Sequence, residues 1–286
     1  MRLVPQESCA ILSVDWSSIK NDGGLSQIVK AKELEAVFQR LKLDGESIQN
    51  IVVFSGLNSQ RISGLLLRGA FDSRQVITEL KRQGWNEDSL DGNKVYVHTS
   101  EYIALPSRNT LFAGTREAAL GVFLAKSSTE SSIVGSPSYK KVNSGISTTT
   151  SKPVKAFLLL PQGTLDMADA ALTTTSVALS FFNLGGIGQL LKVVNVARGF
   201  AFTLDHESHY RYPVELCVLM RDEEAAAFIS GSLNAMKGLS ELAAGGDVRD
   251  QAAIREFQKM RITRTDEVLA VKLEMPADTL FPRFTR

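Results

Sequence analysis

Residues 65–72 read LLLRGAFD, and residues 215–222 read ELCVLMRD. Each stretch is an apolar run that ends on aspartate, a residue type that commonly caps the start of a helix. Helix-like sequence follows in both places, SRQVITELKRQGW after the first run and EEAAAFISGSLNAM after the second. The same strand-to-helix joint therefore occurs twice in the chain, at Asp72 and at Asp222.

The same order of elements surrounds both joints. In the first half, apolar runs and helical periodicity predict strands at 10–14, 51–54, 62–70, 94–97 and 110–113, and helices at 25–43, after Asp72 and at 116–125. In the second half they predict strands at 156–160, 199–203, 214–220, 258–264 and 267–274, and helices within 164–194 and after Asp222. Corresponding elements of the two halves are separated by nearly the same number of residues, which indicates an internal duplication. The polar stretch 86–92 is expected to be a turn.

This pattern predicts an α+β protein of two related halves. Each half is expected to hold a mostly antiparallel sheet with helices on one face, in a ferredoxin-like element order with an extra strand and helix. The expected domains are residues 1–126 and 153–286. Residues 127–152, rich in Ser and Thr, are expected to connect them, with a short helix after Pro137.

Composition excludes several classes of function. The chain has 286 residues, 32 Lys and Arg against 31 Asp and Glu, and a formal net charge of +1. No basic stripe with interleaved aromatic residues is present, so neither a nucleic acid nor an anionic membrane surface is an expected partner. No apolar run approaches the roughly 18–20 residues that a membrane-spanning helix needs, so no transmembrane segment is expected.

The two cysteines and the start of the sequence bear on cellular location. Cys9 and Cys217 lie in apolar runs and are expected to be buried core residues, with a disulfide between the halves as the alternative. The first residues, MRLVPQESCAILSVDW, lack the regions of a signal peptide, which predicts a cytoplasmic protein. A periplasmic or cell-envelope location is expected instead if a leader was removed.

Several motifs of the first half are similar to those of a family of bacterial proteins. Arg68-Gly69-Ala70-Phe71 ends a strand before a helix, and residues 114–118, GTREA, open the helix after the last strand. In these motifs the chain resembles uncharacterised, acidobacterial-type exported proteins of unknown function. The resemblance implies a duplicated α+β unit and an export leader on many members, and it carries no catalytic residues over to this chain.

One polar cluster offers metal ligands. Asp205-His206-Glu207-Ser208-His209 holds two of the three histidines of the chain. In a tight turn, His206 and His209 could converge on a metal ion with Asp205 or Glu207, because zinc favours such nitrogen and oxygen ligands. A solvated hairpin turn is the alternative, since polar residues are usual there.

No other catalytic pattern stands out. The nucleophile elbow, the Walker loop and a glycine-rich dinucleotide loop after a strand are all missing from the sequence, so no cofactor is expected. The leading hypothesis is a non-catalytic binding or interaction protein of the bacterial cell envelope, whose partner is an unidentified protein or a small apolar ligand. The alternatives are a metal-assisted hydrolase around His206 and His209, and a cytosolic scaffold.

Overall fold

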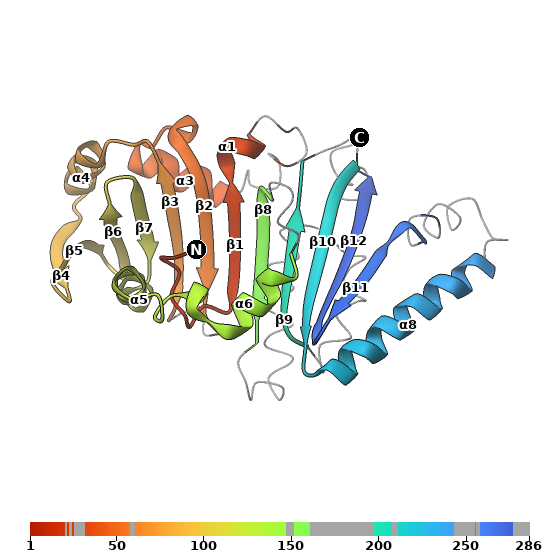
Figure 1. The fold of residues 1–286 in the computed structure, drawn as a ribbon. Coiled ribbons are helices and arrows are strands. Elements are labelled where there is room, and N and C mark those ends of the chain that lie inside the picture. The colour runs from red at the N-terminus through yellow and green to blue at the C-terminus, as the bar shows by residue number, and fades with distance from the viewer. Residues whose placement is uncertain are drawn as a thin grey trace. The chain divides into compact units, whose positions relative to one another are not determined.

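The computed structural model describes residues 1–20, 22, 25, 32–57, 61–146, 152–160, 197–206, 211–242, 255 and 258–276. The chain divides into two compact units, Met1–Pro137 (unit 1) and Ser138–Arg286 (unit 2). Each unit combines antiparallel strands with helices, so the predicted α+β class is confirmed (Figure 1). The helix expected within 164–194 lies outside the described residues.

Unit 1 contains an antiparallel sheet with the strand order β1-β2-β3-β7-β6-β5-β4. Its strands are β1 (Ala10–Asp15), β2 (Ile48–Ser55), β3 (Ser63–Gly69), β4 (Asn86–Leu90), β5 (Asn93–His98), β6 (Glu101–Ser107) and β7 (Thr110–Gly114). Its helices are α1 (Trp16–Ile19), α3 (Lys32–Leu41), η1 (Gly45–Ser47), α4 (Ser73–Arg82), α5 (Arg116–Ser127) and η2 (Ile133–Gly135). Helix α5 packs on β6, β7 and β3, and α3 packs on α4.

A row of directly paired side chains forms part of the core of unit 1. Val14, Ile51, Leu67 and Leu111 lie opposite one another on β1, β2, β3 and β7. They are between 0% and 2% exposed. Full burial of an aliphatic side chain contributes about 1.5–3 kcal/mol. This apolar layer therefore joins β1, β2 and β3 to β7, which lies much later in the sequence.

Both aspartates of the repeated joint cap helices, as predicted. The Asp72 carboxylate accepts a hydrogen bond from the Arg74 backbone N–H at 2.8 Å, at the start of α4. The Asp222 carboxylate accepts one from Ala225 N–H, also at 2.8 Å, at the start of α8 (Glu223–Leu242). That bond, with help from Arg221, lowers the pKa of Asp222 below its usual range.

A third cap ties a helix to a distant strand. The Thr115 hydroxyl accepts a hydrogen bond from the Ala118 backbone N–H at 3.3 Å, at the start of α5. The same hydroxyl donates to the Arg61 carbonyl at 2.6 Å, just before β3. The Thr115 backbone N–H also donates to the Ser63 carbonyl at 3.0 Å. The first turn of α5 is therefore fixed to the start of β3.

The structure corrects the predicted topology of the first half. Strand β1 pairs directly with β2, and the pairing is antiparallel, whereas a ferredoxin-like order would place another strand between them. The stretch expected as a turn, 86–92, contains β4, whose residues are all polar except Leu90 and show no strand-like alternation. Strand β6 was not predicted. The sequence pattern missed both because neither has the alternation that marks a half-buried strand.

Unit 2 contains an antiparallel sheet with the strand order β8-β9-β10-β12-β11. Its strands are β8 (Val154–Leu159), β9 (Ala197–Leu204), β10 (Arg211–Met220), β11 (Arg261–Thr265) and β12 (Val268–Pro276), and its described helices are α6 (Pro137–Ser144) and α8. The segment expected to connect the domains thus contains η2 and α6, and the α6 side chains Tyr139 and Val142 are buried.

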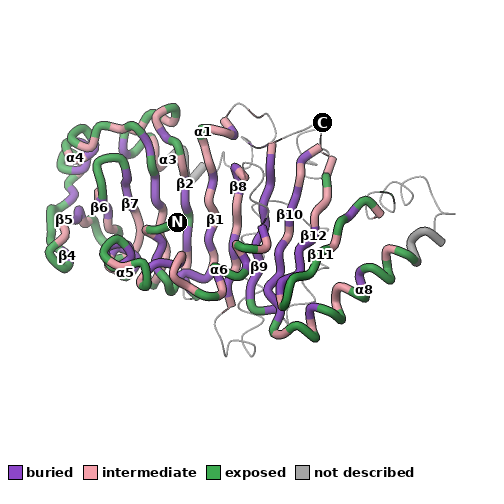
Figure 2. Tube along the Cα trace, in the orientation of Figure 1, coloured by how far each residue is buried: buried purple, intermediate pink, exposed green. Residues whose placement is uncertain are grey.

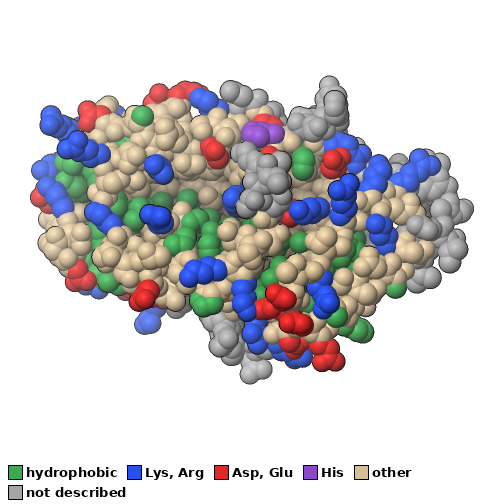
Figure 3. All heavy atoms as spheres, viewed as in Figure 1, with side chains coloured by type: hydrophobic (Ala, Val, Ile, Leu, Met, Phe, Trp, Pro, Cys, Tyr) green, Lys and Arg blue, Asp and Glu red, His purple; other side chains and the backbone are tan. Residues whose placement is uncertain are grey.

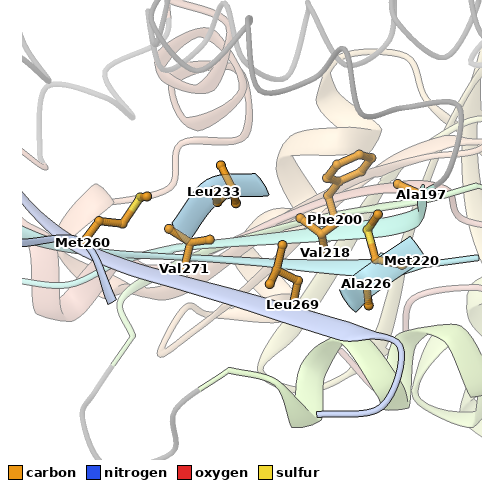
Figure 4. Close-up of a cluster of buried hydrophobic side chains, with 9 residues drawn as sticks. All are labelled: Ala197, Phe200, Val218, Met220, Ala226, Leu233, Met260, Leu269 and Val271. Atoms are coloured by element: carbon orange, nitrogen blue, oxygen red, sulfur yellow. The ribbon is translucent and has the colours of Figure 1, made fainter. Parts of the chain in front are cut away.

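One face of the unit 2 sheet packs against α8. Figure 4 shows the cluster, in which Ala226 and Leu233 of α8 meet apolar side chains of the strands. The strand members include Phe200 on β9, Val218 on β10 and Val271 on β12. This layer buries the side of each strand that faces the helix.

The opposite face of the same sheet packs against α6, so the expected placement of helices on one face is wrong for unit 2. The Tyr139 and Phe157 rings lie 4.9 Å apart between centroids. A side chain at Gly145 would lie 3.2 Å from the Cys217 sulfur. Cys217 neighbours Val218 on β10 and therefore points to the other face. Both faces need a cover because β10 is apolar on both sides.

Within the described helices, none is long and apolar enough to cross a bilayer.

The carboxylate of Glu79 on α4 makes unit 1 sensitive to acid. Its side chain is 7% exposed and lies 3.7 Å from the Lys42 ammonium. Hydrogen bonds from Arg82, and then from Gln83, lower the pKa of Glu79 from 4.5 to about 2. Because the folded-state pKa is the lower one, this stabilisation is complete above about pH 4.5 and is lost as the pH falls toward 2.

We therefore expect the Glu79→Gln variant to be less stable than the wild type at pH 7. The difference should shrink below pH 4.5 and be mostly lost at pH 2, because the folded-state pKa of Glu79 is about 2 and the carboxylate is then half protonated. Urea unfolding of both proteins across this pH range measures it. A difference that stays constant down to pH 2 would show that the carboxylate charge contributes nothing.

Candidate functional site

The predicted metal cluster is described only in part. Asp205, just after β9, is 8% exposed, and its carboxylate lies 3.8 Å from the Lys152 ammonium and accepts a hydrogen bond from the His206 N–H at 2.8 Å. Glu207 and His209 lie outside the described residues. Among the residues that are described, no three His, Cys, Asp or Glu side chains form a metal-binding group. The metal site therefore stays a prediction.

Asp205 belongs to a group of charges that we call the ion cluster: Lys152, Asp205 and Glu215, which are buried, and Lys272, whose side chain is 42% exposed. Glu215 on β10 is 2% exposed, and its carboxylate lies 3.6 Å from the Lys152 ammonium and 2.9 Å from that of Lys272. The Lys152 side chain is only 8% exposed. Two cations and two carboxylates balance one another, which is the condition under which charges are tolerated inside a protein.

The ion cluster links four segments of unit 2. Lys152 precedes β8, Asp205 follows β9, Glu215 lies on β10, and Lys272 is its direct partner on β12. Its geometry is that of a structural network, because each carboxylate is held by at least one ammonium group. No local sequence pattern predicts the ion cluster, because its members are widely separated along the chain.

Thr203 lies beside the ion cluster with an unsatisfied hydroxyl. It is the direct partner of Glu215 on β9 and is completely buried. Its hydroxyl oxygen makes no hydrogen bond with the described part of the chain. A buried polar group without a partner costs about 1–3 kcal/mol relative to a satisfied one.

We expect the Thr203→Val variant to raise the free energy of unfolding by about 1 kcal/mol, because valine has the same branched shape and no hydroxyl to desolvate. Urea unfolding followed by circular dichroism measures the change. The Thr203→Ser variant is the control, since it keeps the hydroxyl and removes a methyl group, and it should be destabilised. A loss of stability in Thr203→Val would show that the hydroxyl is bonded in solution.

Both thiols are buried and free, as expected for core cysteines, and the alternative of a disulfide is wrong. Burial, and then the nearby Glu215 charge, raises the pKa of Cys217 to about 12. Burial also raises the pKa of Cys9. A nucleophilic cysteine needs a lowered pKa and access to solvent, and neither thiol has these properties.

Unit 1 exposes an apolar part of one face of its sheet, where other segments would normally cover such side chains. Leu12, Val53, Leu65 and Ala113 are direct partners across β1, β2, β3 and β7, and we call them the open row. Direct partners lie on the same face of a sheet, so the four side chains form one continuous apolar band. Val53 is 40% exposed, and the other three are partly exposed.

The open row continues the core of unit 1 onto the surface. Two residues along each strand lies the fully buried row that contains Ile51 and Leu67, on the same face. The cover over this face therefore ends between the two rows. Contiguous exposed apolar patches on a folded protein commonly mark sites of interaction. No sequence pattern predicts this surface, because an apolar residue on a strand looks the same in sequence whether a helix covers it or not.

Two further apolar side chains are exposed on α8 of unit 2. Phe228 is 72% exposed and Met236 is 57% exposed. They are separated by eight positions and are interspersed with small and polar residues such as Gly231 and Asn234. Scattered exposed apolar residues are normal, so they form a weaker candidate surface than the open row.

The chain matches no family model and no curated protein. Its fold is similar to solved structures of TP0453, a Treponema protein. Crystal form IV has a TM-score of 0.51 at 11% identity, covering 100% of this chain and 96% of that one. Form I has a TM-score of 0.50 at 10% identity, covering 98% and 93%. At such identities the likeness shows that the chain shares the α+β fold of TP0453, and no more.

Proposed function

We propose that the chain is a non-catalytic binding protein of the bacterial cell envelope, and that its partner docks on the open row. The observation that carries this proposal is the row itself, in which an apolar band with Val53 at 40% exposure lies beside residues exposed by 2% or less. Covering such a band would remove apolar surface from water at about 25 cal/mol per Å².

The shape of the surface favours a protein partner over a small apolar ligand. The open row runs across four neighbouring strands, which places it on the face of a sheet. Small molecules favour concave sites that enclose most of their surface, whereas protein interfaces are commonly broad and apolar at the centre. A small apolar ligand is the alternative outcome of the experiment below.

The envelope location is supported by the resemblance of Arg68-Gly69-Ala70-Phe71 and of residues 114–118 to motifs of exported bacterial proteins. The similarity to TP0453 supports the fold alone.

We also propose that the two units arose by duplication of one ancestral unit. The order β1-β2-β3-β7-β6 in unit 1 has the same sequence of connections as β8-β9-β10-β12-β11 in unit 2. The capped helices α4 and α8 follow the corresponding strands β3 and β10. Among the strands of unit 1, only β4 and β5 have no described counterpart in unit 2. The open row would then be a later specialisation of unit 1.

Photo-crosslinking in the source bacterium tests the binding proposal. A photoreactive amino acid replaces Val53, and in a matched control it replaces Arg68, which is exposed and lies on the other face of β3 from Leu65. We expect a specific crosslinked protein band at position 53 that is missing at position 68. Fractionation of the same cells should place the band with the envelope.

Two results would contradict the proposal. Equal crosslinking at positions 53 and 68 would show that the open row attracts no partner. Crosslinking at position 53 to a small apolar molecule, without a protein band, would replace the protein partner by a ligand. The Leu65→Lys change, made in the protein that carries the photoreactive residue at position 53, places a charge in the open row directly opposite the probe and is expected to remove the band.

A further inference from the structure

The first residues of the chain bind to unit 1 in the manner of an added strand. We call Met1–Ser8 the N-terminal arm. Within the arm, Pro5 forms an isolated antiparallel bridge with Ser132, which directly precedes η2. Two backbone hydrogen bonds flank this bridge: Gln6 N–H donates to the Ser131 carbonyl at 3.0 Å, and Ile133 N–H donates to the Val4 carbonyl at 2.9 Å. Pro5 therefore occupies a position at which the bridge requires no N–H group, and the main chain holds the arm as it would hold a bound strand.

The arm fits into a place beside α5 and η2, which we call the seat. Val4 is 0% exposed, and Pro5 is also buried (Figure 2). Gly121 of α5 leaves the space for Pro5, because a Cβ atom at Gly121 would lie 2.7 Å from the Pro5 Cγ atom and 2.8 Å from the Pro5 Cβ atom. The seat therefore matches this segment in shape as well as in hydrogen bonding.

A single turn, which we call the hinge, folds the arm back onto its own unit. The Ser8 N–H donates to the Pro5 carbonyl at 3.1 Å, and the two residues between them, Gln6 and Glu7, have no positive φ, as in a type I turn. Ser8 is only 2% exposed, and its hydroxyl makes no hydrogen bond with the described part of the chain. The folded hinge therefore buries an unsatisfied polar group, which costs free energy.

We propose that two copies of this chain exchange their N-terminal arms, so that the arm of each copy occupies the seat of the other. The contacts between arm and seat are the same in both states, so only the hinge differs between them. Extension of the hinge gives the Ser8 hydroxyl access to water, which favours the exchanged state, and short hinges under strain promote such exchange. The occupant of the seat is the segment that already fits it, supplied by a second copy.

The charges of the protein allow two copies to approach each other. The formal net charge is +1 for 286 residues, and Figure 3 shows acidic and basic side chains interspersed over the face of unit 1 that it draws. A net charge near zero gives little repulsion between copies. The exchange uses the seat and not the open row, so its failure would leave the proposed binding function unaffected.

Disulfide trapping distinguishes an exchanged arm from one that stays on its own chain. Bridge partners flanked by hydrogen bonds, as Pro5 and Ser132 are, have Cα atoms about 4.5 Å apart, which a disulfide can span. The Pro5→Cys/Ser132→Cys variant is unfolded in urea with reductant, refolded at several protein concentrations and oxidised, while the native thiols are buried. A denaturing gel without reductant separates single chains from covalent dimers. We expect the ratio of dimer to monomer to rise with the protein concentration, as mass action requires.

The hinge offers a variant that should favour the exchange. In the trapping background, Glu7→Pro places proline at the third position of the turn, where it drives Gln6 out of the helical region and toward an extended backbone. We expect roughly tenfold more dimer at a given protein concentration. Glu7→Ala is the matched control, since it removes the same side chain without restricting the backbone, and it should leave the dimer fraction unchanged.

Complementation between two variants tests the arm and the seat separately. In the trapping background, Gly121→Ala blocks the seat, because its Cβ atom would lie 2.8 Å from the Cβ atom of residue 5, which cysteine keeps. Val4→Asp spoils the arm, because the seat would bury its charge. Each variant alone is expected to give roughly tenfold less dimer. A mixture should form dimers again, because the intact arm of the first variant meets the intact seat of the second. Circular dichroism confirms that each variant folds, and Val4→Thr replaces Val4→Asp if the latter does not.

The possible results are distinct. Dimers that carry the link between positions 5 and 132, as mapped by peptide mass spectrometry, and that return on mixing establish the exchange. Disulfides confined to single chains, in the Glu7→Pro variant as well, would show that each arm serves only its own chain and would overturn the proposal. Dimers that form equally well when the seat is blocked would overturn it too, because they do not depend on the contact.

Discussion

Replacement of Lys152 by methionine is expected to lower the free energy of unfolding by about 3 kcal/mol, because breaking a buried ion pair by removing one partner typically costs 3–5 kcal/mol. The Lys152 ammonium lies between the carboxylates of Asp205 and Glu215, at 3.8 Å and 3.6 Å. Without it, both buried carboxylates lose a shared cation, and among the described ion pairs of the cluster only that between Glu215 and Lys272 remains. We place the effect at the lower end of the range because Lys272 remains on Glu215.

Urea unfolding followed by far-ultraviolet circular dichroism measures this loss. The matched control is Lys155→Met, because Lys155 lies on β8 in the same cross-strand row, opposite Thr203, and makes no ion pair with a described side chain. The control should change stability by no more than about 0.5 kcal/mol. The Lys152→Met/Glu215→Gln double variant should recover part of the loss. Equal effects of the two methionine variants would show that the ion cluster does not stabilise unit 2.

The second large effect is expected at Gly69, the last residue of β3. The Gly69→Ala change would place a methyl group 2.2 Å from the Ser47 carbonyl oxygen and 2.9 Å from the Ile48 Cα atom. Both contacts are with backbone, so no side-chain rotation relieves them. We expect a loss of about 3 kcal/mol, the upper part of the range for overpacking, as β2 and β3 are forced apart.

Tryptophan fluorescence during urea unfolding measures the Gly69 effect, because Trp16 and Trp85 both lie in unit 1. Gly231→Ala is the matched control, and its unfolding is followed by far-ultraviolet circular dichroism because both tryptophans lie in unit 1. Gly231 lies within α8, and a Cβ atom there would meet nothing within 4 Å. Alanine favours a helix over glycine by about 1 kcal/mol, so the same substitution should stabilise the protein at that position. A neutral Gly69→Ala variant would show that the backbone near Ser47 can move.

Local signals in the sequence predicted the capped joints correctly. Asp72 and Asp222 cap α4 and α8 because a short acidic side chain reaches the free backbone N–H groups of the first turn, whatever surrounds it. Strand β10 was predicted from its apolar run, and its two-sided burial explains why the run does not alternate. Strands β4 and β6 were missed because one is an exposed edge and the other has an irregular pattern of burial.

Local sequence patterns could not predict which strands pair with each other, and they could not predict the candidate site. The direct contact of β1 with β2 depends on which edges meet after the chain has turned back through α3. The open row is exposed because the segments that cover this face of the sheet end beside it. The identities of Val53 and Leu65 do not reveal where those segments end. Asp205 was predicted as a candidate metal ligand, whereas its described partner is Lys152, more than fifty residues earlier.

The bonds of Thr115 imply an order of events during folding. A helix the length of α5 is marginal by itself, so it depends on its cap and its packing. Its capping hydroxyl is held by the Arg61 carbonyl, 54 positions earlier in the chain. The chain between Arg61 and Thr115 must close into a loop before the cap is oriented. The entropic cost of this closure therefore comes before the stabilising contacts of α5 form. Helix α5 is therefore expected to gain its full stability only when β3 has docked against β7, and to fray when that docking is released.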